Sequence, residues 1–318
     1  MKMTFQKLVI GASMAIGVSA LATVPAQAGT LTGASIGGTA ASDYSVYDVQ
    51  GNSTILLDNT SKSANVQKVL DGNAANPTGN VELRASSEQA NFDFTKNTSL
   101  TGQIGGQSIT LSSLTSADWF STASGSSTAY GVNNLANTWF SQFYDAAGLA
   151  ANESTIKLAL GLPSFTPSSY IREQAYNAFF GIGGFQRSSD PNISYVNQND
   201  TTGDIKIGLA GHLNLKTYYA PLLGTFGNFL KDGFQASEVV KVTYNGKTDF
   251  LYSFSATDSG LTNSLGVGAD GVSHSGNYEV SIKGVVPPAA VPEPSIILGL
   301  LGVAGVFVTQ RKFKKVSI

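Results

Sequence analysis

The sequence holds one match to the pattern of a catalytic serine. Residues 33–37 read GASIG and place Ser35 at the centre of G-x-S-x-G, a pattern whose serine is a nucleophile on a turn between a strand and a helix. The residues before this run belong to an apolar leader rather than to a strand-forming segment. Because the required context is missing, we interpret the match as a coincidence in a Gly/Ser-rich chain and predict no catalytic role for Ser35.

His212 and His274 are the two imidazole side chains of the sequence, and they could act as general bases. His212 follows an alternating apolar segment, and His274 lies in a Gly-, Ser- and Asp-rich stretch. Neither belongs to an H-E-x-x-H zinc motif, and a Ser–His–Asp site depends on geometry that spacing cannot supply. We therefore expect both to be structural or solvated, while a functional role stays open.

Oxygen-bearing side chains are dense between residues 190 and 204. They are Asp190, Asn192, Ser194, Asn197, Asn199, Asp200 and Asp204. Calcium prefers such ligands, but the D-x-[DN]-x-[DN]-G loop with its closing Glu is absent from the sequence. Because Asn and Asp also close turns through their side chains, we predict turns in this stretch, and no metal or cofactor.

Aromatic side chains are plentiful, with 12 Tyr and 17 Phe. Most of them fall at helical or strand spacing, which is typical of core packing. The adjacent pair Tyr218 and Tyr219 is the one we expect to be exposed, where its rings could stack on a sugar. This pair keeps a carbohydrate-binding function open.

The charge content limits the classes of partner. Charged residues form 13% of the chain, about half of the usual share. When the two terminal segments, 1–28 and 291–318, are left out, 13 basic and 20 acidic side chains remain, which is a net charge of −7. Such a body does not suit nucleic acid, which is bound by clustered Lys and Arg. Since the sequence has no Cys, disulfides and thiol chemistry are excluded.

The N-terminal segment 1–28 has the pattern of a secretory signal peptide. Lys2 and Lys7 precede an uncharged apolar run over residues 8–24, and Ala26 and Ala28 form an A-x-A cleavage site. We predict export through the secretory translocon and cleavage by signal peptidase after Ala28.

The C-terminal segment 291–318 combines a proline-flanked acid, an apolar run and a basic end. Residues 292–294 read Pro-Glu-Pro, and residues 295–310 carry no charge. The basic end holds Arg311, Lys312, Lys314 and Lys315. The apolar run is slightly short for a spanning helix, and the basic cluster would stay on the cytoplasmic side. We therefore predict a single transmembrane helix that arrests the exported chain.

Together these three features resemble the PEP-CTERM sorting signal. The resemblance covers the segment 291–318 and implies recognition of Pro292, Glu293 and Pro294 by exosortase, a membrane enzyme that removes the tail. The body is also similar to uncharacterised PEP-CTERM proteins of cyanobacteria. The runs that carry this second similarity are ANTWF at 136–140, SDPN at 189–192 and GLAGH at 208–212. It implies no activity.

Four segments follow from these patterns. They are a signal peptide at 1–28, an exported body at 29–286, a Pro-rich spacer with the PEP motif at 287–294, and a transmembrane helix with its basic tail at 295–318.

Periodicity within the body predicts the elements of its fold, because strands alternate apolar and polar residues and helices repeat them at i, i+3 and i+4. The predicted strands cover 44–49, 53–57, 81–84, 92–94, 104–111, 204–209, 239–244, 248–254 and 278–282, and the predicted helices cover 132–147, 154–160, 168–180 and 221–231. This order indicates an α+β fold, mainly antiparallel β-sheet with a few central α-helices.

Two sorting signals around a body without a catalytic motif lead us to expect a non-enzymatic surface or extracellular-matrix protein, associated with exopolysaccharide. Two alternatives stay open, namely a secreted hydrolase that acts on polysaccharide and a carbohydrate-binding module. The hydrolase would need carboxyl groups or a serine triad that only folding brings together. Paired acids in a deep cleft would favour it.

Overall fold

The computed structural model describes residues 28–265 and 272–287. The predicted signal peptide with Ala26, the Pro-Glu-Pro motif and the predicted transmembrane helix with its basic end lie outside the described residues. Ala28 is the first described residue and begins strand β1. Within the described ranges, no helix has the length and apolar character that crossing a membrane requires.

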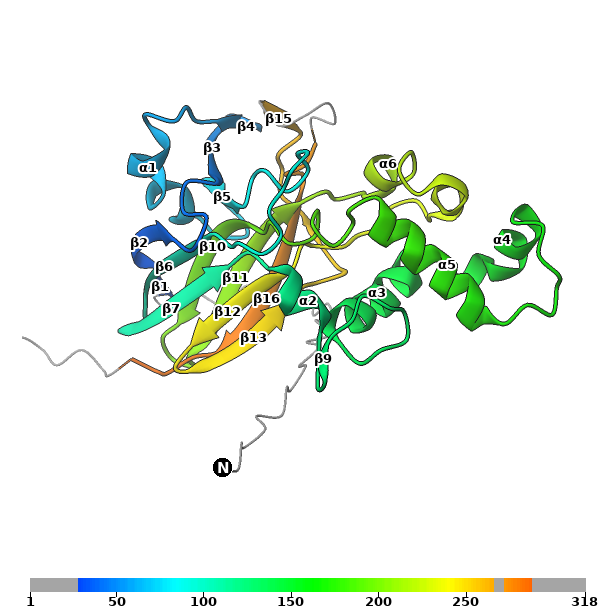
Figure 1. Cartoon of the computed structure of the whole chain (residues 1–318). Helices are drawn as coiled ribbons and strands as arrows, with labels where there is room; N and C mark the ends of the chain where they lie inside the picture. The colour runs from blue at the N-terminus through cyan, green and yellow to red at the C-terminus, as the bar shows by residue number, and fades with distance from the viewer. Residues whose placement is uncertain (1–27, 266–271, 288–318) are drawn as a thin grey trace, which may run out of the picture.

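Two curled β-sheets hold most of the described strands, and the larger one has nine of them (Figure 1). They run in the order β14 (Thr257–Asp258), β16 (Gly276–Lys283), β11 (Asp204–Gly211), β10 (Asn192–Asn199), β5 (Gly79–Leu83), β3 (Tyr44–Gln50), β4 (Ser53–Leu56) and β15 (Asn263–Leu265), and β1 (Ala28–Thr30) pairs with β10. Strand β15 is parallel to β4, whereas the neighbouring β3–β4 pair is antiparallel.

The smaller main sheet has five described strands. They run in the order β13 (Lys247–Leu251), β12 (Val240–Tyr244), β7 (Gln107–Ser112), β6 (Ser99–Ile104) and β2 (Thr32–Gly37). The turn between β12 and β13 has positive φ at Asn245 and Gly246, 48° and 72°, as a type I′ hairpin requires. Apolar side chains from both sheets, among them Val46, Leu111 and Ile207, share one buried core.

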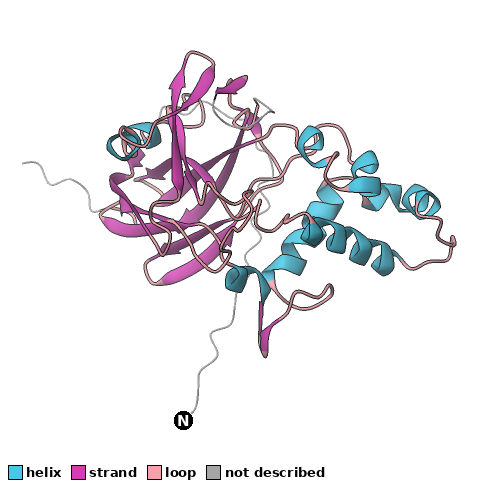
Figure 2. Cartoon of the chain, turned by 45° about the horizontal axis from the view of Figure 1, so that its top comes forward, coloured by secondary structure: helices cyan, strands magenta, loops and turns pink. Residues whose placement is uncertain are grey.

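Four of the described helices lie together on one side of the strands (Figure 2). They are α3 (Leu135–Ala146), α4 (Glu153–Ala159), α5 (Ser168–Gly181) and α6 (Lys216–Tyr219). Helix α3 begins where the Asn134 side chain accepts a hydrogen bond from the Asn137 backbone N–H at 2.9 Å, which satisfies an otherwise unpaired donor. We call α3–α6 the helical lobe. Its core is rich in aromatic rings, such as Trp139 and Phe179 at 5.6 Å between centroids.

Smaller elements complete the described chain. They are α1 (Lys62–Asn65), α2 (Ser116–Phe120), the paired strands β8 (Ser121–Thr122) and β9 (Gly125–Ser126), and 3-10 turns at Lys68–Leu70, Ala150–Asn152 and Gly224–Phe229. Helices α2 to α5 lie between Leu114 and Ser189, whereas α6 follows later in the chain. The Leu114 N–H donates to the Ser189 carbonyl at 3.0 Å, so the two ends of the segment 115–188 lie side by side.

The predicted α+β class with mainly antiparallel sheets is confirmed. Two of the predicted elements are wrong. Residues 92–94 form a turn rather than a strand, because the Asp93 carboxylate accepts hydrogen bonds from the backbone N–H and hydroxyl of Thr95. Residues 221–231 contain a 3-10 turn rather than an α-helix.

Candidate functional site

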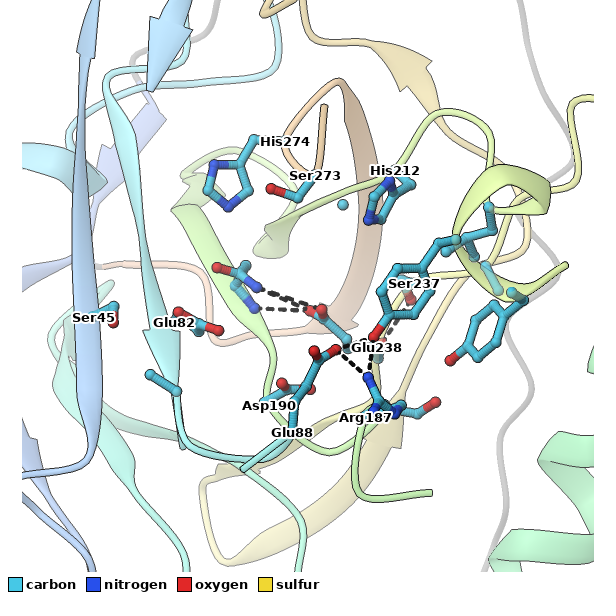
Figure 3. A pocket seen from close by; sticks show the side chains of 18 of the residues that line it. Ser45, Glu82, Glu88, Arg187, Asp190, His212, Ser237, Glu238, Ser273 and His274 are labelled. Atoms are coloured by element: carbon cyan, nitrogen blue, oxygen red, sulfur yellow. Dashed lines mark hydrogen bonds and ion pairs between the residues drawn. The ribbon is translucent and has the colours of Figure 1, made fainter. Parts of the chain in front are cut away.

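An open cavity of about 850 Å³ lies where the ends of several strands meet the helical lobe (Figure 3). Side chains of β3, β5 and β10 and of the segments next to β11, β12 and β16 line its sheet side, and α3 and α6 line its lobe side. Exposed residues at its mouth are Leu56, Glu88, Gln89, Thr217 and Pro221. The volume falls in the range of small-molecule sites.

Register places Glu82 in the cavity wall. In the larger sheet, Glu82 of β5 stands directly between Ser45 of β3 and Asn192 of β10, so these three side chains share one face. The Tyr47 hydroxyl donates to Oε2 of Glu82 at 2.9 Å. Burial is the main cause that raises the pKa of Glu82 to about 7, because a low-dielectric surrounding disfavours the charged carboxylate.

Glu238 reaches the same space from the segment that leads into β12. Its carboxyl accepts from Asn192 at two points, with 3.1 Å from the backbone N to Oε2 and 3.4 Å from Nδ2 to Oε1. Burial raises the pKa of Glu238 to about 8, although the bonds from Asn192 act in the opposite direction. The raised pKa lets Glu238 hold a proton at neutral pH.

Asp190 is the third carboxyl of the group and lies just before β10. Its side chain accepts a hydrogen bond from Ser87 through Oδ2, whereas Oδ1 is buried and has no partner in the described part of the chain. Burial, followed by the nearby charges of Glu238 and Glu82, raises the pKa of Asp190 well above its usual range. We call Glu82, Asp190 and Glu238 the carboxyl cluster.

A cation closes the lower side of the mouth beside the carboxyl cluster (Figure 3). Nη1 of Arg187 lies 2.7 Å from Oε1 of Glu88 and donates to the Tyr218 hydroxyl at 2.6 Å. The Tyr218 hydroxyl also donates to Glu88. These three side chains come from separate segments, so their contacts tie the loop after β5 to helix α6.

Both histidines line the cavity. His274 is only 2% exposed, and its Nδ1 lies 2.7 Å from the Thr54 hydroxyl while its ring meets the Tyr47 ring edge-on at 4.7 Å. The ring of His212 lies 5.3 Å from that of Tyr218 at an angle of 30°. Folding thus brings to one site two residues that the sequence leaves far apart.

The remaining predicted candidates divide between the site and the surface. Ser35 is an exposed residue inside β2 and does not line the cavity. Tyr218 lines the mouth, but the prediction that Tyr219 is exposed is wrong, since it is 4% exposed and packs against Phe143 in the aromatic core of the lobe. Asn199 closes the predicted turn, accepting from the N–H of Thr201 at 2.9 Å.

Asp190 and Asn192 are not turn residues, contrary to the prediction for residues 190–204. Each is buried in the cavity wall, and Asn192 begins strand β10. Sequence reasoning also missed Glu82 and Glu238. The available signal was an acid inside a strand-forming apolar run, as in Val81-Glu82-Leu83.

Among residues 28–265 and 272–287, no group of three or more His, Asp or Glu side chains is arranged to hold a metal ion. The chemistry that the described side chains can perform is proton transfer, because the carboxyl cluster can both give and take protons near neutral pH.

Comparison with known protein families, with curated protein sequences and with solved structures finds no match for this chain.

Proposed function

We propose that this chain is an exported hydrolase that cleaves glycosidic bonds of a polysaccharide in the cavity between the strands and the helical lobe. The observation that carries the proposal is the meeting of Glu82, Asp190 and Glu238 in an open cavity, with pKa values raised by burial. Most glycosidases use two carboxyl groups, one of which has a raised pKa and acts as the acid. The cluster supplies such groups.

The two glutamates divide the chemistry according to their pKa values. Glu238, with a pKa of about 8, gives its proton to the glycosidic oxygen as the bond from that oxygen to the anomeric carbon breaks. Glu82, with a pKa of about 7, takes a proton from the water that bonds to the anomeric carbon. Solvent then returns this proton from Glu82 to Glu238, and the cycle is complete.

The decisive experiment follows the release of reducing ends from a panel of polysaccharides, including exopolysaccharide from the producing cells. We expect Glu238→Gln to lower the rate by about 10²–10⁴-fold, the usual contribution of a general acid. Glu279→Gln is the control, because Glu279 is also a hydrogen-bonded glutamate, accepting from the Tyr195 hydroxyl at 2.9 Å, but does not line the cavity. Hydrolysis by Glu238→Gln at a rate close to that of the wild type would exclude this mechanism.

Binding without turnover is the second candidate. It is supported by the half-buried rings of Tyr218 and His212 at the mouth, because sugars stack on such rings. If the wild type and Glu238→Gln bind the same glycan with equal affinity and neither releases reducing ends, the protein is a carbohydrate-binding module and not a hydrolase.

The location at the cell exterior is a proposal that rests on the two ends of the sequence alone. We propose that signal peptidase cuts after Ala28 and that an exosortase-like enzyme acts at the Pro-Glu-Pro motif, so that the body reaches the cell surface or the matrix. The intact mass of the extracellular protein is the test. A species that runs from Gly29 to the neighbourhood of Pro294 supports both steps, and a species that keeps residues 295–318 argues against removal of the tail.

A further inference from the structure

The cavity has an excess of negative groups over positive ones. Among the described residues that line it, four carry carboxyl groups and Arg187 alone carries a guanidinium or ammonium group. Arg187 is already paired with Glu88, the most exposed of the four, at 2.7 Å. The carboxyl cluster thus shares its space with no unpaired Lys or Arg of the described chain, and burial together with mutual repulsion opposes its ionisation.

Hydrogen-bond acceptors in the same wall lack donors. Oδ1 of Asp190 and Oδ1 of Asn192 are buried and have no partner within the described ranges, and the two side chains belong to residues only 6% and 7% exposed. The hydroxyl of Ser273, a third lining residue, is likewise buried and unpaired. A buried acceptor left unpaired is destabilising. These acceptors therefore point to a ligand that brings hydrogen-bond donors.

The lobe side of the cavity is aromatic. Tyr218 of α6 presents a half-buried ring there, and behind it lie Trp139 and Phe143 of α3 and Tyr219 of α6, which are 1–4% exposed. An aromatic face accepts both the apolar face of a sugar ring and a positive charge. One wall thus suits a sugar ring while the other suits a charged donor.

We propose that the ligand of this cavity is an amino sugar with a free, protonated amine, whose ammonium group donates to Asp190 and Asn192 while its ring lies against the aromatic side chains of the lobe. The inference rests on the proposed function and names its substrate class. An ammonium group brings three donors and a positive charge, which match the unpaired acceptors and the carboxyl excess. A neutral sugar supplies donors without charge, and an acidic sugar would be repelled.

Proton release gives the inference a readout that does not depend on turnover. Burial raises the pKa values of Glu82 and Asp190 in the empty cavity, and a bound cation lowers the pKa of the carboxyls closest to it. Other titratable or charged groups that face the cluster are Tyr47, Glu88, Arg187, His212, Tyr218, Tyr219 and His274. An amino sugar should therefore expel protons when it binds, whereas its neutral counterpart should expel few.

The experiment is calorimetry of the whole exported body with two probes that differ only in the amine, β-1,4-linked oligomers of glucosamine and of glucose, in two buffers of different ionisation enthalpy. At about pH 6, below the ordinary pKa of an amine, we expect the glucosamine oligomer to bind at least about tenfold tighter and to release protons. Equal affinity, tighter binding of the glucose oligomer, or binding of neither overturns the inference.

A variant adds a second measurement. Asp190→Asn should remove most of the tenfold preference and of the proton release, and Glu279→Gln should change neither. If Asp190→Asn does not fold, the comparison of probes on the wild type decides alone. Hydrolysis of a neutral polymer without preference for the amine would refute the amino-sugar inference but not the proposed hydrolase activity. Tight binding of the amino sugar without hydrolysis would refute the hydrolase activity but not the amino-sugar inference.

Discussion

Two tyrosine–glutamate pairs in the larger sheet make the same contact in different surroundings. The Tyr47 hydroxyl donates to Glu82 at 2.9 Å, and the Tyr195 hydroxyl donates to Glu279 at 2.9 Å. Glu279 also meets the ammonium group of Lys206 at 2.6 Å, and its side chain is 34% exposed. No Lys or Arg bonds to Glu82 in the described chain.

The comparison shows that a tyrosine donor does not by itself determine whether a glutamate can exchange a proton near neutral pH. A neighbouring cation and exposure to solvent determine it. Glu279 is paired with Lys206 and partly exposed, so its contact with Tyr195 is a structural tie across strands. Glu82 faces a cavity whose burial raises its pKa to about 7, so it can exchange a proton at neutral pH. The experiments below test this difference.

The largest expected effect is on the pH dependence of stability. The native state keeps the Glu82 proton up to about pH 7, whereas the unfolded chain releases it near the ordinary value of 4.5. Between these values the unfolded state binds fewer protons, so the free energy of unfolding falls as pH rises. The full shift in the pKa of Glu82 corresponds to about 3 kcal/mol of unfolding free energy. In Glu82→Gln, the free energy of unfolding should therefore fall by about 3 kcal/mol less between these pH values than it does in the wild type.

Urea unfolding across this pH range measures it, with Glu279→Gln as the control expected to keep the slope of the wild type. If the Glu82→Gln curve runs parallel to that of the wild type, Glu82 does not hold its proton in the folded protein.

A glycine makes room for the Tyr195 ring beside Glu279. Gly208 of β11 lies between Tyr195 and Glu279 in the register, and a Cβ on it would come within 2.2 Å of the Tyr195 ring. We expect Gly208→Ala to reduce the free energy of unfolding by about 1–3 kcal/mol through overpacking. Gly181→Ala is the control, since a Cβ there meets nothing within 4 Å. Equal stability of the two variants would show that the ring moves aside easily.

Removal of a tyrosine hydroxyl should change the activity at the Tyr47–Glu82 pair and not at the Tyr195–Glu279 pair. Tyr47→Phe takes away a donor that lowers the pKa of Glu82, so that pKa should rise above about 7. If ionised Glu82 is the base, the acidic limb of the pH–rate profile moves to higher pH in this variant. Tyr195→Phe should leave the profile where it is. A shift in both variants, or in neither, contradicts the assignment of Glu82 as the base.

The smallest effect is expected at the surface ion pair. Lys206→Ala removes the cation from Glu279, and exposed pairs contribute only about 0–1 kcal/mol. We expect a loss of stability below about 1 kcal/mol that disappears at high salt. Thermal unfolding at low and high ionic strength measures this loss. A larger loss that does not depend on salt would show that the Lys206–Glu279 pair behaves as a buried ion pair and not as an exposed one.

Local patterns predicted the hairpin and the main helices because each depends on a few neighbouring residues, but they missed β2, β10 and most of β6. The Asn245-Gly246 turn and the helix that contains Trp139 follow from backbone and packing rules that act over one turn. The carboxyl cluster does not follow from such rules. Glu82 alternates with Val81 and Leu83, which normally places an acid in water, and the helical lobe from a distant part of the chain covers that face instead. The sequence likewise predicted a turn at Asp190, because it does not show that folding buries this side chain.

The close approach of Leu114 and Ser189 has a consequence for how such a protein can diversify. Since these two residues are hydrogen-bonded neighbours, the intervening segment 115–188 could be exchanged as one cassette, provided that the replacement packs against α6 and the later residues that share its core. The carboxyl cluster would survive such an exchange, because Glu82, Asp190 and Glu238 come from outside the cassette. Trp139 and Phe143 would not survive it. The same proton-transfer groups could therefore be combined by evolution, or by an engineer, with a new surface for recognition.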